Sequence, residues 1–515
     1  MVQFVTAAEA VKHIPDGCTI AHTGFLTGLI PEAIWKALQK SFLETGSPKG
    51  LTSVFAAGQG DGKEFGLNHF GEEGLLKRAI GGHWNMTPRI GKLAMENKIE
   101  AYNLPQGTIS EWFRNIAGHR PGIITKVGLG TFVDPRLEGG KLNEMTKEDL
   151  VEVIQLNGEE WLWYKPLKID VAVIRGTTAD EDGNITMNQE IGTGEALSIA
   201  QAARACGGIV IAQVKQIAAR GTLDPKMVKI PGLIVDYVVK ADIADHPMTA
   251  DFEFNPLLNG DLKVPMGAMA PMKLNNRKVI ARRCAFELVP NAAVNLGIGI
   301  PEGVSAVAAE EGVGDELTLT TEAGTFGGVP AGGLSFGAST NAQAILDQPY
   351  QFDYYDGGGL DIAFLGLAET DVDGNINVSK FHGRVAGCGG FINITQNSKK
   401  VVYCGTFTVG GLKEEVKDGK LVIVQEGKGK KFLKQVEQIT FSGKYAVSVN
   451  QPVLYVTERA VFKLTPKGLE LTEIAPGIDM QKDVLDLMEF EPIHDNVKLM
   501  DARIFQDAPM GLELK

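Results

Sequence analysis

The sequence predicts an α/β protein made of two related open domains with largely parallel sheets. Short apolar runs rich in β-branched residues alternate with alanine-rich helical stretches along the chain. Runs that are apolar on both faces are typical of buried parallel strands covered by helices. The 62 glycines gather in short loops beside these runs, as tight turns between strands and helices require. A stretch that begins at Asp170 recurs at Asp361, which indicates two domains.

The expected strands, in chain order, are Cys18–Ala21, Val171–Ile174, Ile209–Gln213, Ile234–Val239, Leu317–Thr320, Ile362–Leu365 and Val401–Tyr403. The expected helices are Pro31–Leu38, Glu195–Ala205 and Pro301–Glu310. Pro301 suits the first turn of a helix, where its missing N–H is not needed, and Gly312 favours the end of that helix. Thr6 and Glu9 have the spacing of a capping box, which predicts a short helix near the N-terminus.

The two halves of the chain are related in sequence. Asp170–Thr186 and Asp361–Asn377 share seven of 17 positions without a gap. Composition alone predicts about one identity in such a stretch. A strand followed by an Asp-Gly turn also recurs in unrelated folds, so that explanation stays open. A second pair supports duplication, because Gly28–Glu32 and Gly297–Glu302 are each a glycine turn that leads into a helix begun by proline.

The domain organisation follows from length and composition. A chain of 515 residues is too long for one hydrophobic core. Residues 245–276 carry several Pro and Asn-Gly turn signals and little periodicity, so they predict an irregular connector. We therefore expect an N-terminal α/β domain over 1–244, this connector over 245–276, and a C-terminal α/β domain over 277–515 that carries Glu322.

Charge and composition exclude several classes of partner. A net charge of −13 repels phosphate backbones and anionic lipid, so we expect neither nucleic acid nor a membrane as partner. The chain has no apolar run of membrane-spanning length and does not begin like a signal peptide. Its five cysteines form no CxxC pair, which fits a reducing cytoplasm. The eight histidines show no metal-binding spacing, so no metal is expected.

One carboxylate stands where α/β sheets place their sites. Glu322 comes just after the expected strand Leu317–Thr320 and begins a loop rich in glycine. The carboxyl ends of strands are where ligands bind in open α/β sheets. Glycine N–H groups beside a carboxylate nucleophile could stabilise the oxyanion that it creates. The alternative is an ordinary loop glutamate, and spacing alone favours the nucleophile only modestly.

Two other glycine loops admit rival interpretations. Leu296–Gly303 followed by Glu322 has the outline of a dinucleotide fold, which would make the protein an NAD-dependent oxidoreductase, but its third glycine is one place late. The loop Val385–Phe391 precedes a stretch that could open a helix, and its N–H groups could receive a thioester oxygen. Cys388 in that loop is more often a packing residue than a nucleophile.

The chain resembles the class I coenzyme A transferases, and most closely their single-chain branch that uses propionate, acetate and related acids. The matching stretches run in order along nearly the whole chain: Asn103–Gly107, Val127–Arg136, Val294–Pro301, Glu322–Gly337, Tyr354–Asp361, Gly387–Ile394 and Glu473–Asp479. One departure is visible. Two-subunit members carry Glu-Asn-Gly at the nucleophile, whereas this chain has Glu322-Ala323-Gly324, which points to the single-chain branch and removes an amide donor.

The resemblance implies a reaction and a set of roles. Glu322 would attack an acyl-CoA, form an anhydride and then a glutamyl-CoA thioester, and pass CoA to a second short-chain carboxylate. No separate cofactor is implied, because CoA is a substrate held covalently during turnover. A homotetramer is implied as well, and the location expected from the sequence is the cytoplasm. A protein that only binds acyl-CoA is the non-catalytic alternative.

Seven further residues receive roles from the resemblance. Gln106 would hold the Glu322 carboxylate and donate to an oxyanion. Gly24 and Phe25 would wall the acyl pocket. Gly297 and Gly299 would supply backbone donors near the nucleophile, and Gly389 and Gly390 would bind the thioester end of CoA.

Overall fold

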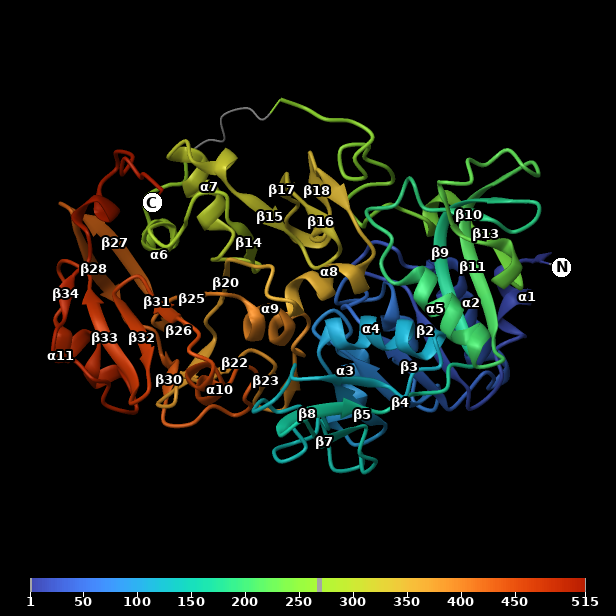
Figure 1. Cartoon of the computed structure of the whole chain (residues 1–515), viewed down its shortest axis with the longest axis horizontal. Helices are drawn as coiled ribbons and strands as arrows, with labels where there is room; N and C mark the ends of the chain where they lie inside the picture. Colours follow the sequence, from blue (N-terminus) through green and yellow to red (C-terminus); the bar gives the residue numbers. More distant parts are fainter. Residues whose placement is uncertain (1, 266–270, 515) are drawn as a thin grey trace. The chain divides into compact units, whose positions relative to one another are not determined.

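The computed structural model describes residues 2–265 and 271–514, and the chain forms two compact units (Figure 1). Unit 1 comprises Met1–Val264, Thr321–Asp353 and Lys380–Asn393. Unit 2 comprises Pro265–Thr320, Tyr354–Ser379 and Ile394–Lys515. Part of the expected connector, 266–270, lies outside the described residues. Among the helices described, none is long and apolar enough to cross a membrane.

These units differ from the expected division at 244 and 276, which follows chain order. Both units are discontinuous, and the Glu322 loop clusters with unit 1 rather than with the second half of the chain. Side chains far apart in sequence explain this. Thr27 donates to the carbonyl of Leu334 at 2.8 Å, and the Ser335 hydroxyl donates to Asp251 at 2.6 Å. Such non-local bonds have no local sequence signal.

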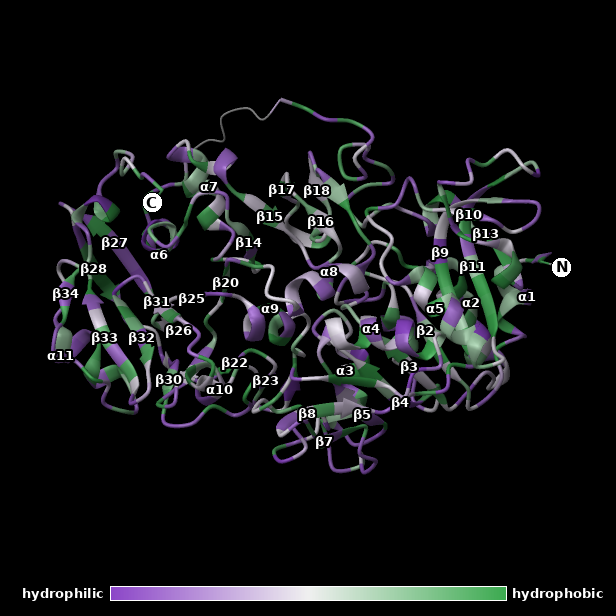
Figure 2. Ribbon diagram, viewed as in Figure 1, coloured by the Kyte–Doolittle hydropathy of each residue, from purple (hydrophilic) through white to green (hydrophobic). Residues whose placement is uncertain are grey.

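Unit 1 is built on a parallel sheet with strand order β1-β13-β11-β9-β2-β3-β4-β5. The strands are β1 (Gln3–Phe4), β2 (Thr19–His22), β3 (Leu51–Phe55), β4 (Leu76–Gly81), β5 (Glu100–Asn103), β9 (Val171–Asp180), β11 (Ile209–Ala218) and β13 (Tyr237–Lys240). Every residue of β9 is buried, as expected of a central parallel strand. Figure 2 shows the hydrophobic colour concentrated on strands such as β11. The short strands β10 (Ile185–Thr186) and β12 (Val228–Ile230) add antiparallel pairs.

The helices of this part of the chain are α1 (Ala7–Val11), α2 (Glu32–Thr45), α3 (Pro88–Met95), α4 (Gln106–Ala117) and α5 (Ala196–Ala205). The predicted capping box is confirmed, because Thr6 and Glu9 bond each other's backbone N–H groups. The core of unit 1 includes Trp35, Phe55 and Trp84, which are fully buried. An antiparallel meander of β6 (Ile123–Thr125), β8 (Glu159–Tyr164) and β7 (Val151–Leu156) also belongs to unit 1.

The later segments of unit 1 contain only short elements. They hold β16 (Thr325–Phe326), β17 (Val329–Pro330), β18 (Ser339–Thr340), β19 (Ala344–Ile345), β23 (Lys380–Phe381) and β24 (Arg384–Val385). The helices α8 (Gln348–Asp356) and α9 (Phe391–Asn397) each run from a unit 1 segment into a unit 2 segment.

Unit 2 has its own largely parallel sheet. The order β15-β14-β20-β25-β31 is parallel, while β32 and β33 add antiparallel strands and β34 lies parallel to β33. These strands are β14 (Ala293–Leu296), β15 (Thr318–Thr320), β20 (Ile362–Gly366), β25 (Val401–Cys404), β31 (Val453–Val456), β32 (Ala460–Thr465), β33 (Gly468–Ile474) and β34 (Lys498–Leu499). Its helices are α6 (Asn276–Ala285), α7 (Gly303–Glu310), α10 (Gly443–Ser448) and α11 (Met480–Asp483). Small antiparallel pairs complete the unit: β21 (Glu369–Asp371) with β22 (Ile376–Asn377), β26 (Thr408–Val409) with β29 (Gly429–Lys430), and β27 (Lys413–Lys417) with β28 (Lys420–Gln425), while β30 (Phe432–Leu433) joins β21 in parallel.

The repeated sequences form the same substructure in each unit. Asp170 accepts a bond from the N–H of Thr19 at 2.9 Å, and Asp361 accepts the corresponding bond from Ala293 at 2.8 Å. Asp180 and Asp371 each end a strand and accept N–H bonds from the Asp-Gly turn that follows. Since the shared bonds reach back to β2 in unit 1 and to β14 in unit 2, the similarity exceeds a lone strand and turn. The predicted α/β fold with two related domains is confirmed.

Two element boundaries differ from the expectation. Gly232–Ile234 forms a 3₁₀ turn after Pro231, so β13 begins at Tyr237 and not at Ile234. The helix expected from Pro301 begins at Gly303, because Glu302 is its N-cap. Three expected elements are longer in the structure, because α2 continues to Thr45, β9 to Asp180 and β11 to Ala218, while the others coincide to within a few residues.

Candidate active site

The carboxyl edge of the unit 1 sheet gathers the candidate residues. Gly24 and Phe25 follow β2, Ala57 and Gly58 follow β3, His83 follows β4, and Gln106 follows β5. These four strands are parallel neighbours, so the segments after them emerge at one edge of the sheet. The chain therefore brings together loops that lie between residues 24 and 106 of the sequence. A glycine or a buried polar residue stands in each of them.

Glu322 lies in a turn that buried hydroxyl groups hold. The N–H of Gly324 donates to Thr321 at 3.1 Å, which closes the turn around Glu322. The Thr321 and Thr325 hydroxyls are 2.6 Å apart, and Thr325 bonds Ser339 at 3.0 Å. These hydroxyl groups are buried, so they anchor the turn more firmly than exposed ones would.

The Glu322 carboxylate has an unusual environment. The residue keeps some contact with solvent, yet burial raises the pKa of its carboxyl to about 7. Among the described residues, no other residue donates a hydrogen bond to this carboxylate. Burial that outweighs the single bond from its own backbone N–H makes this carboxylate more basic than an ordinary one. Such a group is suited to act as a nucleophile.

An apolar cluster surrounds the residue next to Glu322. Ala323 packs with Phe25, Leu26 and Phe336, and Met86 covers the same cluster. The Phe25 and Phe336 rings have centroids 6.3 Å apart. The structure therefore brings Phe25 beside the Glu322 loop, while Gly24 lies on Gln59, whose Cδ would be 2.5 Å from a Cβ at Gly24.

Gln106 has a buried amide group with an unused donor. It is the first residue of α4 and only 2% exposed, and its Nε2 has no hydrogen-bond partner within the described part of the chain. Its backbone N–H donates to the carbonyl of Gly389 at 2.9 Å. A Cβ at Gly389 would lie 3.6 Å from Gln106 Oε1. The structure thus brings together Gln106 and the loop that contains Gly389 and Gly390.

The two glycines of that loop differ in their backbone bonds. The N–H of Gly389 donates to Gly82 at 2.8 Å, so it is already used. The N–H of Gly390 has no partner among the described residues, and it lies just before α9. Cys388 is buried, burial raises the pKa of its thiol, and its sulfur lies near the carbonyl of Leu104. These contacts support its interpretation as a packing residue.

Gly297 and Gly299 lie in unit 2, between β14 and α7. The N–H of Gly297 donates to Phe364 at 2.8 Å, within the sheet edge, so it is not a free donor. A Cβ at Gly299 would meet no atom within 4 Å, and the φ of this residue is +91°, as in a turn glycine. Gly303, the third glycine of the dinucleotide outline, faces Ala281 of α6 and not the sheet. This geometry gives the dinucleotide interpretation no support.

Two buried groups near this edge escaped sequence reasoning. His83 lies between Gly58 and Gly389, and its only sequence signal is its place after two glycines at a strand end. Glu195 is 1% exposed, neither carboxylate oxygen has a partner in the described residues, and burial raises its pKa to about 8. Within the described ranges, no three His, Cys, Asp or Glu side chains are grouped to hold a metal.

Comparisons with known proteins agree along the entire chain. The family model described as coenzyme A transferase matches residues 4–241. The caffeate CoA-transferase of Acetobacterium woodii is 50% identical over 100% of this chain and 99% of its own. The acetate CoA-transferase YdiF of Escherichia coli (strain K12) is 46% identical, over 100% of this chain and 97% of its own.

The solved structures agree with the sequence comparisons. The apoenzyme of the acyl-CoA transferase YdiF from Escherichia coli O157:H7 superposes with a TM-score of 0.95 at 46% identity, covering 100% of this chain and 98% of its own. Its thioester complex with CoA gives 0.94 at 45% identity, with the same coverage. Full-length similarity at this level, together with the fold and the carboxylate loop, shows that the chain belongs to the class I coenzyme A transferases.

Proposed function

We propose that this enzyme moves CoA between short-chain acyl-CoA and free carboxylates through covalent intermediates on Glu322. The observation that carries this proposal is the Glu322 carboxylate itself, which is basic, receives no hydrogen bond from another described residue, and lies beside an apolar cluster. A relative that is 45% identical over the whole chain forms a thioester complex with CoA, which supports the same chemistry here.

The reaction consists of two exchanges. A Glu322 oxygen attacks the thioester carbonyl carbon, and the C–S bond breaks with loss of CoA as thiolate, which leaves an acyl-glutamyl anhydride. The thiolate then attacks the Glu322 carbonyl carbon, releases the first acid as carboxylate, and leaves a glutamyl-CoA thioester. The acceptor carboxylate reverses these steps. The thioester is passed on and not hydrolysed, so no cofactor and no ATP enter, and water must be excluded from the anhydride.

Each remaining residue receives a role on this proposal. Gln106 Nε2, which has no partner, donates to the oxyanion that forms in each exchange. Gly390 offers a free N–H to the thioester end of CoA, whereas Gly389 shapes the loop through its carbonyl bond to Gln106. Phe25 and its apolar neighbours form the wall that faces the acyl chain. Gly297 and Gly299 are turn residues that precede α7 and stay assigned to the site by the family resemblance alone.

The proposed substrates are acetate and propionate. The apolar cluster around Ala323 is closely packed, with Phe25 3% and Phe336 5% exposed, which favours a small acyl group. The acetate CoA-transferase relative supports the same choice, and the caffeate relative identifies the competing one. Measuring kcat/KM for acetate, propionate, butyrate and caffeate as acceptors decides between them. A preference for caffeate would refute the assignment. A homotetramer in the cytoplasm is also part of this proposal.

The test is mass spectrometry after incubation with propionyl-CoA. We expect a CoA adduct on the peptide that contains Glu322, removable by added acetate. Glu322→Gln should give no adduct and lose CoA exchange by at least about 10³-fold, since the nucleophile is absent. Glu316→Gln, a nearby exposed glutamate, is the matched control and should behave like the wild type. An adduct elsewhere, or exchange retained by Glu322→Gln, would overturn the mechanism.

A further inference from the structure

His83 lies against glycines at the carboxyl edge of the unit 1 sheet. It comes two residues after β4, and its backbone pairs with Gly387 in an isolated antiparallel bridge. Its Nδ1 packs against Gly58, where a Cβ would collide with the ring. A Cβ at Gly389 would be 3.5 Å from His83 Cδ2. The imidazole therefore lies beside two glycines, and at Gly58 it occupies space that a side chain would fill.

The ring makes no hydrogen bond with the described residues. Its Nδ1 is buried and has no partner. Burial alone lowers the pKa of the imidazole to about 4, and no charged group contributes to that change, so the ring is neutral at neutral pH. A neutral imidazole carries its proton on either Nδ1 or Nε2. A proton on Nδ1 would leave a buried N–H without an acceptor, which costs more than an unpaired nitrogen, so the proton belongs on Nε2. Neutral histidine, held in one tautomer, is an established electrophile toward developing oxyanions.

The Cβ and Cδ2 side of His83 lies toward Gly389. Cδ2, the carbon bonded to Nε2, is the ring atom that approaches Gly389, and Gln106 Oε1 approaches the same glycine. On the other side of Gly58, Ala57 packs in the cluster that contains Ala323, the neighbour of Glu322. Met86 touches both this cluster and Gly58. A continuous set of contacts thus connects His83 with the Gln106 amide and with the Glu322 loop.

We propose that His83 is a substrate-contacting residue whose neutral Nε2–H donates, beside Gln106, to the acyl oxygen as Glu322 attacks the thioester carbonyl. This rests on the proposed function and adds a second side-chain donor to it. This donor takes the place of the asparagine amide that two-subunit members carry after the nucleophile, because Ala323 at that position has no amide group. A neutral donor suits this position. A cation would also stabilise the free donor or acceptor carboxylate in the ground state, and this would raise the barrier to its reaction.

Three substitutions separate donation from packing. The Gln side-chain amide nitrogen reaches the position of imidazole Nε2, whereas the Asn nitrogen reaches only that of Nδ1. We expect His83→Phe and His83→Asn to slow glutamyl-CoA formation in a single turnover by about 10²-fold, the usual effect of losing one oxyanion donor. His83→Gln should recover most of that rate. The KM for propionyl-CoA should change by less than about threefold in all three variants, because the donor acts mainly in the transition state.

The control is His13→Phe, at a histidine whose ring stacks on Tyr237 with centroids 4.1 Å apart, and four strands separate the strand of Tyr237, β13, from β4. It should keep the wild-type rate. A second measurement uses the infrared carbonyl band of ¹³C-labelled propionyl-CoA bound to Glu322→Gln. The band should lie at lower frequency than in the double variant with His83→Phe, since a donor weakens the C=O bond.

The outcomes are distinct. If His83→Phe keeps the wild-type rate within about twofold, or if His83→Asn and His83→Gln are equally slow, the donor role is wrong. An unchanged infrared band would also overturn it. Absence of any glutamyl-CoA adduct in the wild type would instead refute the proposed function, while the infrared comparison would still test donation to the bound thioester. If His83→Phe fails to fold, the Asn and Gln variants decide.

Discussion

At the residue scale, Glu322 shows how burial sets reactivity. A carboxyl with pKa about 7 is partly protonated at neutral pH, and only its ionised form is a nucleophile. The rate of glutamyl-CoA formation at low substrate should therefore rise about tenfold per pH unit below pH 7 and level off above it. Single-turnover experiments between pH 5 and pH 9 check this. A rate that is flat from pH 5 upward would show an ordinary, solvated carboxylate.

A second residue-scale argument concerns Gly337. It has a φ of +106°, and a Cβ there would lie 2.5 Å from Phe25 and 3.2 Å from Ala323. Gly337→Ala should push Phe25 into the acyl pocket and lower kcat/KM for propionyl-CoA by at least about tenfold, one decade per 1.4 kcal/mol. Gly333→Ala is the matched control, because Gly333 also has a positive φ, +61°, but has open space around it. Equal effects of the two variants would assign the loss to backbone strain and not to Phe25.

At the element scale, the predictable parts of the fold are those with a local cause. β9, β11, β20 and β25 are apolar on both faces, so their sequence runs identify them. By contrast, β4 contains Lys77 and Arg78 and was not predicted. The helix α2 runs to Thr45, beyond the expected end at Leu38. The expectation stopped short because Gln39, Lys40 and Ser41 are at least partly exposed and hide the apolar periodicity of the helix. Polar residues on strands and helices thus limit what periodicity can identify.

The residues of the site also divide into those with a local sequence signal and those without one. Glu322 has a sequence signal in its strand and glycine loop, and Gln106 was named by the family resemblance. His83 has only the two preceding glycines as a signal, because its surroundings depend on Gly58 and Gly389, which are 25 and 306 residues away in the chain. The assignment of the Glu322 loop to unit 1 likewise depends on bonds such as Thr27 to Leu334. Non-local packing of this kind is not written in any short stretch.

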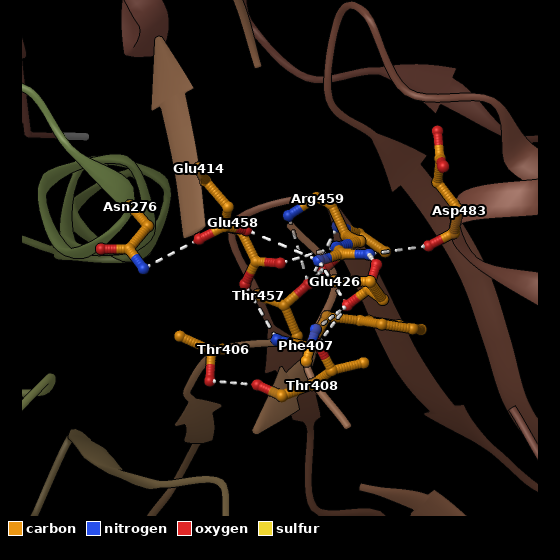
Figure 3. A network of polar contacts seen from close by, with 12 residues as sticks. Asn276, Thr406, Phe407, Thr408, Glu414, Glu426, Thr457, Glu458, Arg459 and Asp483 are labelled. Atoms are coloured by element: carbon orange, nitrogen blue, oxygen red, sulfur yellow. Dashed lines mark hydrogen bonds and ion pairs between the residues drawn. The ribbon is translucent and has the colours of Figure 1, made fainter. Parts of the chain in front are cut away.

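At the scale of the whole molecule, unit 2 contains a buried cluster of charges to which no reaction chemistry is assigned above (Figure 3). Arg459 is fully buried and donates to Glu458 at 2.7 Å and to Glu426 at 2.7 Å. Glu414 faces the same guanidinium at 3.5 Å. Because burial and the neighbouring Glu458 raise the pKa of Glu414 to about 9, Glu414 keeps its proton at neutral pH.

Removing the arginine should destabilise this unit strongly. Arg459→Met leaves buried carboxylates without their cation, and breaking such a cluster costs about 3–5 kcal/mol. The urea midpoint and Tm should both fall in the variant. Arg220→Met, which breaks an exposed pair with Asp182, is the control and should change the unfolding free energy by less than about 1 kcal/mol. A small effect of Arg459→Met would mean that the carboxylates simply take up protons.

Glu195 connects burial with the pH dependence of stability. Burial raises its pKa in the folded chain to about 8, from an ordinary 4.5, so the folded state binds more protons than the unfolded state between these values. Its contribution to stability is therefore complete below pH 4.5 and is lost as the pH rises through about 8. Stability is lost on ionisation because neither carboxylate oxygen has a hydrogen-bond partner in the described residues to stabilise the buried charge.

Glu195→Gln replaces the protonated acid by a neutral amide of similar shape and should remove this loss. The Tm of the variant should exceed that of the wild type by an amount that grows between pH 6 and pH 9, reaching several degrees, since about 1 kcal/mol shifts the Tm of a large domain by 2–4 °C. Thermal melts at four pH values check this, with the exposed Glu144→Gln as control. A Tm difference that stays constant over this range would show that Glu195 is ionised in the folded protein and has a counter-charge.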